Sequence, residues 1–261
     1  MTRFAAGVEY HGARYCGWQR QGHVAGSVQE HVERALSRVA DEPVQVVTAG
    51  RTDAGVHATG QVFHFDSTRV RAERAWHWGA NRHLPPDIRL LWVQAVADEF
   101  HARYSALSRA YRYVILNRRV PPAIHAGLAV HEHRPLDATR MARAAGALVG
   151  THDFSAFRSA DCQAKQPTRT IMELIVNRAG EWVWFDVRAD AFLQHMVRNI
   201  AGTLLAIGAG EREEDWAREV LQSRDRTRAG AAAPAAGLYL AEVRYPERWS
   251  LPPAQPRCRF W

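Results

Sequence analysis

Strand-like and helix-like segments alternate along the chain in an order that leaves few folds open. Ser27-Val28-Gln29-Glu30 is a capping box and predicts a helix whose apolar residues Val28, Val32, Ala35, Leu36 and Val39 share one face. Around it we expect a second helix at 69–83 and strands at 3–10, 44–49, 61–66 and 88–96. The first half therefore follows the order β-α-β-β-α-β.

The same order returns in the second half of the chain. There we expect helices at 137–149 and 192–207 and strands at 109–117, 170–178, 182–189 and 237–244. Each half matches the ferredoxin-like unit, an antiparallel sheet with its helices on one face. The sequence thus predicts an α+β protein with two ferredoxin-like halves, joined into one extended, mainly antiparallel sheet with a central active-site cleft.

The expected boundaries give an N-terminal half at 1–105, a C-terminal half at 106–246 and a tail at 247–261, rich in proline. The tail ends in aromatic residues suited to docking on the body or on a second subunit. Longer irregular stretches are expected at 118–135, 158–169 and 209–236. Loops of this length are usually functional or mobile.

The charge of the chain favours a polyanionic partner. Of its 34 basic residues only Lys165 is a lysine, and the formal net charge is +7. Arginine binds phosphate in a bidentate manner and stacks on bases, which suits a nucleic acid. Biased codon usage is an alternative explanation of the arginine excess, so the charge alone does not identify RNA.

Three cysteines, at positions 16, 162 and 258, are far apart and form no Cys-x-x-Cys pair, which argues against a disulfide framework or a zinc ribbon. The first residues contain no apolar stretch long enough for a signal peptide, and no later run approaches the length of a membrane span. We therefore expect a cytoplasmic protein without a membrane segment.

The segment 49–58, between two predicted strands, carries the chemistry. Asp53 lies between Gly50 and Gly55, which permit a tight turn and a close approach to a ligand. The cation of Arg51 favours the ionised carboxylate, as a nucleophile requires. A plain hairpin turn with Arg51 in solvent is the alternative that the spacing leaves open.

Gly50-Arg51-Thr52-Asp53-Ala54-Gly55-Val56-His57 resembles the signature of the tRNA pseudouridine synthase A family. Four further motifs resemble that family in the right order, so that the resemblance covers residues 4–246: Tyr10-His11-Gly12 with Tyr15-Cys16-Gly17-Trp18-Gln19, Phe100-His101-Ala102-Arg103 with Arg109-Ala110-Tyr111-Arg112-Tyr113, His195-Met196-Val197-Arg198-Asn199, and Gly237-Leu238-Tyr239-Leu240. One departure is His11, where the family usually has aspartate, and it affects only a local turn contact.

The resemblance implies the pseudouridine synthase fold and the isomerisation of uridine to pseudouridine at positions 38, 39 and 40 in the anticodon arm of tRNA, by a homodimer. The base leaves its ribose, turns and rejoins through carbon, so no cofactor or metal is required. The sequence agrees, because it has no phosphate loop, no dinucleotide-binding glycine motif and no His-Glu-x-x-His.

The resemblance also assigns roles to single residues. Asp53 is the nucleophile, Arg51 helps to hold the flipped base out, and Tyr111 stacks on the uracil and relays a proton. Arg198 pairs with the carboxylate and Leu238 lines the uracil pocket. RNA contacts are expected from Phe100, His101, Ala102 and Arg103, and from Asp161, Cys162, Gln163, Ala164 and Lys165.

Each of these residues also has a plain structural interpretation. Without the motifs, Tyr111 and Leu238 would be ordinary strand core, Arg198 a surface helix arginine, and the loop 158–169 a solvated loop. Two other functions compete as well: a module that only binds structured RNA, and a hydrolase that uses Asp53 and His57 as metal ligands or base. A Ser-His-Asp or Cys-His hydrolase is disfavoured, because no Gly-x-Ser-x-Gly is present.

Overall fold

The computed structural model describes residues 1–20, 26–254 and 258–260. The chain forms two compact units, of which the first is Met1–Arg109 with Tyr239–Cys258 and the second is Ala110–Leu238 with Arg259–Trp261. This division differs from the sequence-based one, which assigns residues 239–246 to the second half. Within the described part, no helix is both long and apolar enough to cross a membrane.

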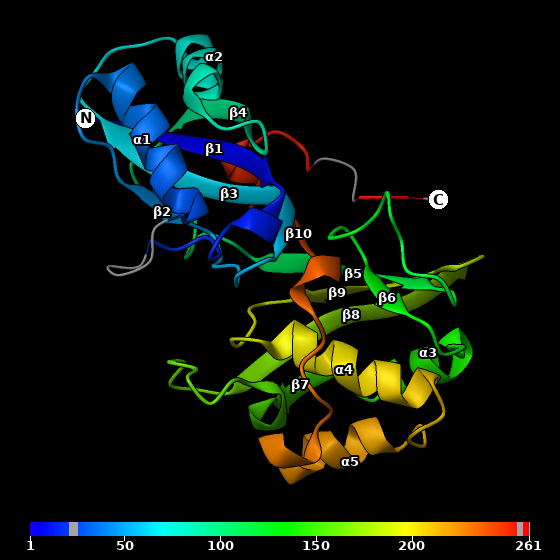
Figure 1. Cartoon of the computed structure of the whole chain (residues 1–261). Coiled ribbons are helices and arrows are strands. Elements are labelled where there is room, and N and C mark those ends of the chain that lie inside the picture. Colours follow the sequence, from blue (N-terminus) through cyan, green and yellow to red (C-terminus); the bar gives the residue numbers. More distant parts are fainter. Residues whose placement is uncertain (21–25, 255–257, 261) are drawn as a thin grey trace. The chain divides into compact units, whose positions relative to one another are not determined.

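The first unit is a sheet with two helices (Figure 1). Its elements are β1 (Thr2–Tyr10), α1 (Val28–Ala40), β2 (Val46–Thr48), β3 (His57–Ser67), α2 (Glu73–His83), β4 (Ile88–Val96) and β10 (Leu238–Arg244), with short 3₁₀ turns at Gly12–Arg14 and Glu247–Trp249. β1 lies between β3 and β4 and is antiparallel to both, and β2 is antiparallel to β3. β10 belongs here because it runs parallel to β3, with Tyr239 opposite His57.

Aromatic packing joins α2 to the sheet of this unit. Phe4 of β1 stacks on Phe65 of β3, with ring centroids 5.3 Å apart, and both rings contact Trp76 of α2 at 5.4 and 5.2 Å. α1 begins as expected, because the Ser27 hydroxyl accepts a hydrogen bond from the Glu30 N–H at 3.2 Å. These contacts cover one face of the sheet.

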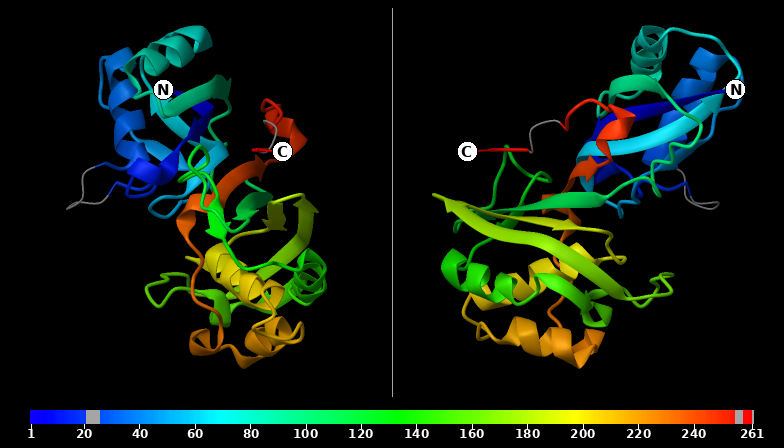
Figure 2. Two further views of the ribbon diagram at one scale, coloured as in Figure 1. Left: turned by 45° about the vertical axis from the view of Figure 1, so that its right-hand side comes forward. Right: turned by 180° about the vertical axis from the view of Figure 1, so that it is seen from behind.

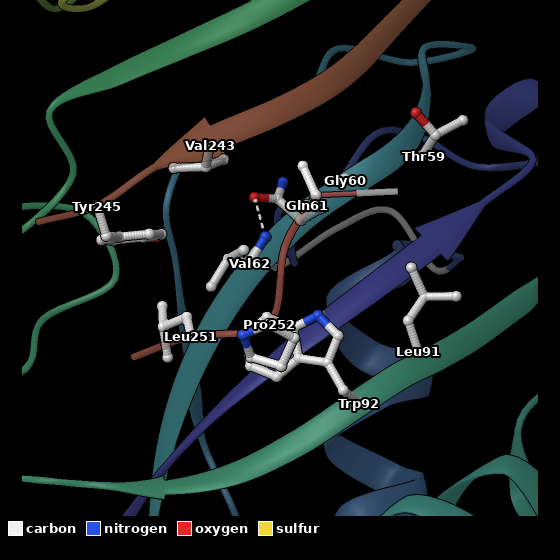
Figure 3. A pocket seen from close by; sticks show the side chains of 12 residues that line it. Thr59, Gly60, Gln61, Val62, Leu91, Trp92, Val243, Tyr245, Leu251 and Pro252 are labelled. Carbon is white, nitrogen blue, oxygen red and sulfur yellow. Dashed lines mark hydrogen bonds between the residues drawn. The ribbon is translucent and has the colours of Figure 1, made fainter. Parts of the chain in front are cut away.

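The opposite face of the same sheet carries the start of the tail. Gly7, three residues after Phe4, points to this face, and a Cβ atom there would come within 2.9 Å of the Trp92 ring. Figure 3 shows Leu251 and Pro252 beside Trp92, around a cavity of about 40 Å³. The tail therefore packs on its own unit as far as residue 254, while residues 255–257 and 261 lie outside the described part.

The second unit is also a sheet with helices on it (Figures 1 and 2). Its elements are β5 (Ser108–Asn117), β6 (Val130–Glu132), α3 (Ala138–Gly146), β7 (Gly150–Asp153), β8 (Thr168–Ala179), β9 (Trp182–Ala189), α4 (Met196–Gly208) and α5 (Trp216–Ser223), with 3₁₀ turns at Ser155–Phe157, Arg226–Arg228 and Ala235–Gly237. The strand order is β5-β9-β8-β7, and β6 pairs in parallel with β5. The predicted α+β class with mainly antiparallel strands is confirmed.

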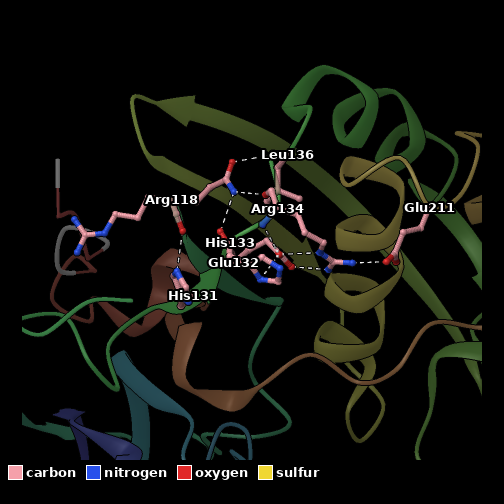
Figure 4. A network of polar contacts seen from close by, with 8 residues as sticks. Arg118, His131, Glu132, His133, Arg134, Leu136 and Glu211 are labelled. Atoms are coloured by element: carbon pink, nitrogen blue, oxygen red, sulfur yellow. Dashed lines mark hydrogen bonds and ion pairs between the residues drawn. The ribbon is translucent and has the colours of Figure 1, made fainter. Parts of the chain in front are cut away.

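Some predicted boundaries are wrong. The stretch 118–135 contains β6, which a polar network stabilises: Glu132 accepts from Arg134 Nε at 2.8 Å, and Asn117 Nδ2 donates to the Glu132 carbonyl at 3.0 Å (Figure 4). The stretch 209–236 contains α5. α4 begins at Met196 rather than 192, because His195 has a left-handed backbone with φ of 61°.

Candidate active site

The loop that carries Asp53 joins β2 to β3 and is fixed by its main chain. The Trp18 N–H donates to the Thr52 carbonyl at 3.0 Å, and the Gly55 N–H donates to the Tyr15 carbonyl at 3.2 Å. These two bonds bracket Asp53, which is half-buried, while its neighbour Ala54 is exposed. The carboxylate is thus held at the surface of the first unit by a loop with little freedom.

Two buried side chains support the same loop from below. The Tyr10 hydroxyl, whose residue is 4% exposed, shares a hydrogen bond of 2.8 Å with Thr52 Oγ1. Gln61 Nε2 donates to the Gly50 carbonyl at 2.7 Å. Burial raises the pKa of Tyr10 far above its usual value, so this phenol stays a neutral hydrogen-bonding group.

Glycines shape this loop, but not both of those that the sequence suggested. Gly55 has φ of 78°, which favours glycine, as expected. Gly50 is different, because its φ is not in the left-handed region and a Cβ there would meet no atom within 4 Å in the described part of the chain. The residue that the sequence analysis missed is Gly17, with φ of 92°, where a Cβ would lie 2.5 Å from the Thr52 carbonyl oxygen. Gly17 lies in the motif Tyr15-Cys16-Gly17-Trp18-Gln19, and this position was the signal in the sequence that could have identified it.

Arg109 holds the start of the loop and was also missed as a site residue. Its Nη2 donates to the Ala49 carbonyl at 3.0 Å and to the Arg103 carbonyl at 2.5 Å. Arg51, two residues after Ala49, is exposed. Arg109 therefore links the base of the Asp53 loop to the 100–103 segment.

Buried His57 and half-buried His11 pack together beside the loop. His57 is 1% exposed, its Nδ1 accepts a hydrogen bond from the Gly12 N–H at 3.0 Å, and its ring stacks on Tyr239 at 4.6 Å. His11 precedes the 3₁₀ turn at Gly12–Arg14 without capping it and packs on His57 at 4.7 Å. Among the described residues, no three His, Cys, Asp or Glu side chains are grouped so that they could hold a metal ion.

The second unit contains Tyr111, Arg198 and Leu238. Tyr111 of β5 is 8% exposed, and its ring meets Phe192 edge-on at 5.0 Å. Arg198, in the first turn of α4, is half-buried and its Nε donates to the Ala233 carbonyl at 2.8 Å. Leu238 opens β10 and is 4% exposed. All three side chains are wholly or partly buried rather than fully solvated.

An extended strap, residues 229–234, fixes Arg198 and leads toward Leu238. The Ala233 N–H donates to the Arg198 carbonyl at 3.0 Å, which makes the Arg198 contact reciprocal. The hydroxyl of fully buried Tyr113 donates to the Pro234 carbonyl at 2.8 Å. Burial raises the pKa of Tyr113, and the charge of Arg198 opposes that rise. The phenol is therefore a donor over the working pH range.

The predicted RNA-contact segment 100–103 is only partly accessible. Phe100 and Ala102 are fully buried, and Phe100 packs on Tyr245 and Trp249 at 5.2 and 5.3 Å. Arg103 is exposed and lies over the ring of Tyr104, which is 75% exposed. Any side-chain contact with a macromolecule here falls mainly to Arg103 and to Tyr104, which the sequence analysis did not single out.

The second predicted contact loop is accessible. Asp161, Gln163 and Lys165 are exposed, while Cys162 and Ala164 are half-buried. The loop is tied toward the start of α4, because the Ser159 N–H donates to the Gln194 carbonyl at 2.9 Å and the Cys162 N–H donates to the Ser159 carbonyl at 3.2 Å.

Comparisons with known proteins decide the family. The model of a family described as tRNA pseudouridine synthase matches residues 6–105 and 144–246. The tRNA pseudouridine synthase A of Salmonella arizonae is 53% identical over 252 residues, which cover 97% of this chain and 93% of that protein. The protein of the same name from Thiobacillus denitrificans is 51% identical over 260 residues and 100% of both chains. The chain belongs to the tRNA pseudouridine synthase family.

Membership confirms the expected class of reaction. Members of this family are isomerases that convert uridine to pseudouridine in tRNA, and this is the activity of the chain. The binding-module and hydrolase alternatives are therefore wrong. A solved Cbf5-Nop10-Gar1 complex is also similar, at 14% identity and a TM-score of 0.35, with 77% of this chain and 45% of that one covered. That likeness is too weak to carry an argument.

Proposed function

We propose that this chain isomerises uridines 38, 39 and 40 in the anticodon stem-loop of tRNA, with the Asp53 carboxylate as nucleophile. The observation that carries the proposal is the fixed, half-buried Asp53 between two main-chain hydrogen bonds, from Trp18 to Thr52 and from Gly55 to Tyr15. A preorganised carboxylate attacks without first paying the entropy of ordering its loop.

The target uridine must leave its stack before it can meet Asp53, because a base within a stem is out of reach of a protein side chain. In the proposed mechanism Arg51 occupies the place of the flipped base, a task for which its exposed, planar cation is suited. The uracil stacks on Tyr111 and contacts Leu238. Arg198 is the proposed ion-pair partner of the Asp53 carboxylate.

The atoms balance without any cofactor. The bond between N1 of uracil and C1′ of ribose breaks, the base turns, and a bond between C5 and C1′ forms. The proton on C5 is then lost, with Tyr111 as the proposed relay, and N1 takes up one proton, so that the composition of the nucleotide is unchanged. Asp53 attacks either C6 of the ring or C1′ of the sugar, and both routes return the carboxylate unchanged.

The proposed partner is the anticodon arm, recognised by shape, and the proposed assembly is a homodimer in the cytoplasm. Two copies would span more of an L-shaped RNA than one. The proposed RNA contacts come from two segments. One is Phe100, His101, Ala102 and Arg103, and the other is the loop of Asp161, Cys162, Gln163, Ala164 and Lys165. Their support is the exposure of Arg103 and Lys165.

Pseudouridine mapping tests this proposal. The purified chain is incubated with tRNA transcripts that carry uridine at 38, 39 or 40, or cytidine at all three, and pseudouridine is located by sequencing. We expect modification only of the uridines at 38 to 40. Modification confined to other arms of the tRNA would contradict the positions but not the family activity.

A further inference from the structure

One face of α2 carries arginines whose charge is not compensated. Arg74, Trp78 and Arg82 are four residues apart, so these three side chains fall on one side of the helix, and Arg71 lies in the chain just before the helix begins. Each of the four is exposed, and Trp78 is 65% exposed. We call this set the α2 stripe.

The α2 stripe faces away from the core of its unit. Trp76 and Ala80, on the other side of the helix, are fully buried. Glu73, the acidic residue of the first turn, is drawn toward the sheet, because its Oε1 accepts a hydrogen bond from the Ala95 N–H at 2.8 Å. The acidic residue nearest to these arginines in the sequence therefore bonds the sheet and not an arginine of the stripe.

Several arginines on the other helices have acidic partners, although Arg38 of α1 is exposed and has none among the described residues. Arg34 of α1 pairs with Glu30 at 2.7 Å. In α3, Arg140 pairs with Glu213 at 3.0 Å and Arg143 pairs with Glu214. Across the described residues, Arg71, Arg74 and Arg82 have no ion pair or side-chain hydrogen bond. Three unneutralised guanidinium groups around an exposed indole match a polyanion that also offers flat surfaces for stacking.

We propose that the α2 stripe binds the sugar-phosphate backbone of the tRNA substrate, with Trp78 against a ribose or base. Arg74 and Arg82 are about 12 Å apart along the helix at a rise of 1.5 Å per residue, enough for more than one phosphate. α2 follows the end of β3 that is farther from Asp53, and β3 is about 30 Å long at 3.3 Å per residue. Because β4 begins at Ile88 opposite Tyr10, which bonds Thr52 beside Asp53, the stripe runs from the far end of the sheet back toward the Asp53 end. The proposed tRNA contact therefore extends along the helix away from the reacting nucleotide.

The test compares two triple variants of the full chain with full-length tRNA. Arg71→Gln/Arg74→Gln/Arg82→Gln removes the stripe, and Arg34→Gln/Arg140→Gln/Arg143→Gln removes the same charge from paired sites. We expect the first to raise Kd and KM about tenfold near 0.15 M salt, with kcat changed less than twofold. The slope of log K against log salt should fall by about 2 to 3, and the control should change Kd less than twofold.

Equal weakening of tRNA binding by both triple variants would overturn the proposal, since net charge alone would then explain it. The proposal would also be overturned if Trp78→Ala changed the sedimentation of the protein but left its tRNA affinity unchanged. That result would show that Trp78 contacts a protein partner instead. The inference rests on tRNA as substrate. Because pseudouridine formation by the unaltered chain is measured separately, failure of the proposed function is distinguishable from failure of the stripe.

Discussion

The two units hold their proposed site residues in different ways. In the first, Asp53 is positioned by the main chain, through hydrogen bonds on both sides of it and the close approach of Gly17 to Thr52. In the second, Arg198 is positioned by its own side-chain bond to the strap, which Tyr113 secures from below. The difference teaches that the position of the proposed nucleophile depends mainly on backbone shape, whereas that of the proposed supporting cation depends on side-chain contacts.

Among changes that leave Asp53 itself in place, the largest effect should come from the backbone of the first unit. In Gly17→Ala the new Cβ would lie 2.5 Å from the Thr52 carbonyl oxygen, so the loop must move. A displacement of about 1 Å at a reacting group costs about a hundredfold in rate, and we expect kcat to fall by roughly that factor.

Gly26→Ala is the matched control, because Gly26 has φ of 97°, close to that of Gly17, but a Cβ there meets no atom of the described residues within 4 Å. It should lower stability by about 1 kcal/mol from the left-handed backbone and leave kcat nearly unchanged. Equal losses of kcat in both variants would show that backbone strain, and not the position of the loop, is responsible.

Acid should weaken the first unit through a buried histidine. Burial, aided by the charge of Arg3, lowers the pKa of His64 from 6.5 to about 4. The unfolded chain therefore binds a proton between these values that the folded chain does not, and stability is lost as pH falls through this window. We expect a loss of about 2 kcal/mol by pH 5 in denaturant unfolding.

His64→Gln keeps an acceptor for the Ala102 N–H, which His64 Nδ1 binds at 3.1 Å, but does not titrate. Its unfolding free energy should change much less between pH 7 and 5. If the unfolding free energy of His64→Gln fell with pH as steeply as that of the unaltered chain, groups other than His64 would be responsible for the acid sensitivity.

A smaller effect is expected from the second unit. Tyr113→Phe removes the donor to the Pro234 carbonyl, which should cost about 1 kcal/mol of stability and roughly fivefold in kcat as the strap loosens. Tyr10→Phe makes the same change beside Thr52 in the first unit.

A double-mutant cycle separates the two tyrosines. In an Arg198→Gln background, Tyr113→Phe should lower kcat little further, because both act through the strap, whereas Tyr10→Phe should keep its full effect. Two additive tyrosine effects would break the proposed link between Tyr113 and Arg198.

The order of the main elements could be predicted because each has a local signal. Ser27 caps α1, apolar periodicity marks its buried face, and β4 was expected at the residues where it lies. β6, β7 and α5 were missed because they are short or polar, and their stability comes from tertiary contacts such as the bond from Asn117 to Glu132. The start of α4 depends on the backbone of His195, which no pattern reveals.

The candidate site was predictable in the same uneven way. Asp53 stands in a motif that the sequence displays directly. The need for glycine at position 17 arises from a contact with Thr52, 35 residues away in the chain. The burial of Phe100 and Ala102 likewise depends on Tyr245, which no local pattern connects to them.

The chemistry of Asp53 is tested most directly by tritium release from tRNA labelled at C5 of uridine, measured in a single turnover with enzyme in excess. Asp53→Asn is nearly isosteric with the native residue but is a poor nucleophile. We predict no detectable release by this variant while its Kd for tRNA stays within about twofold of the unaltered chain. Release at a rate near that of the unaltered chain would contradict the account.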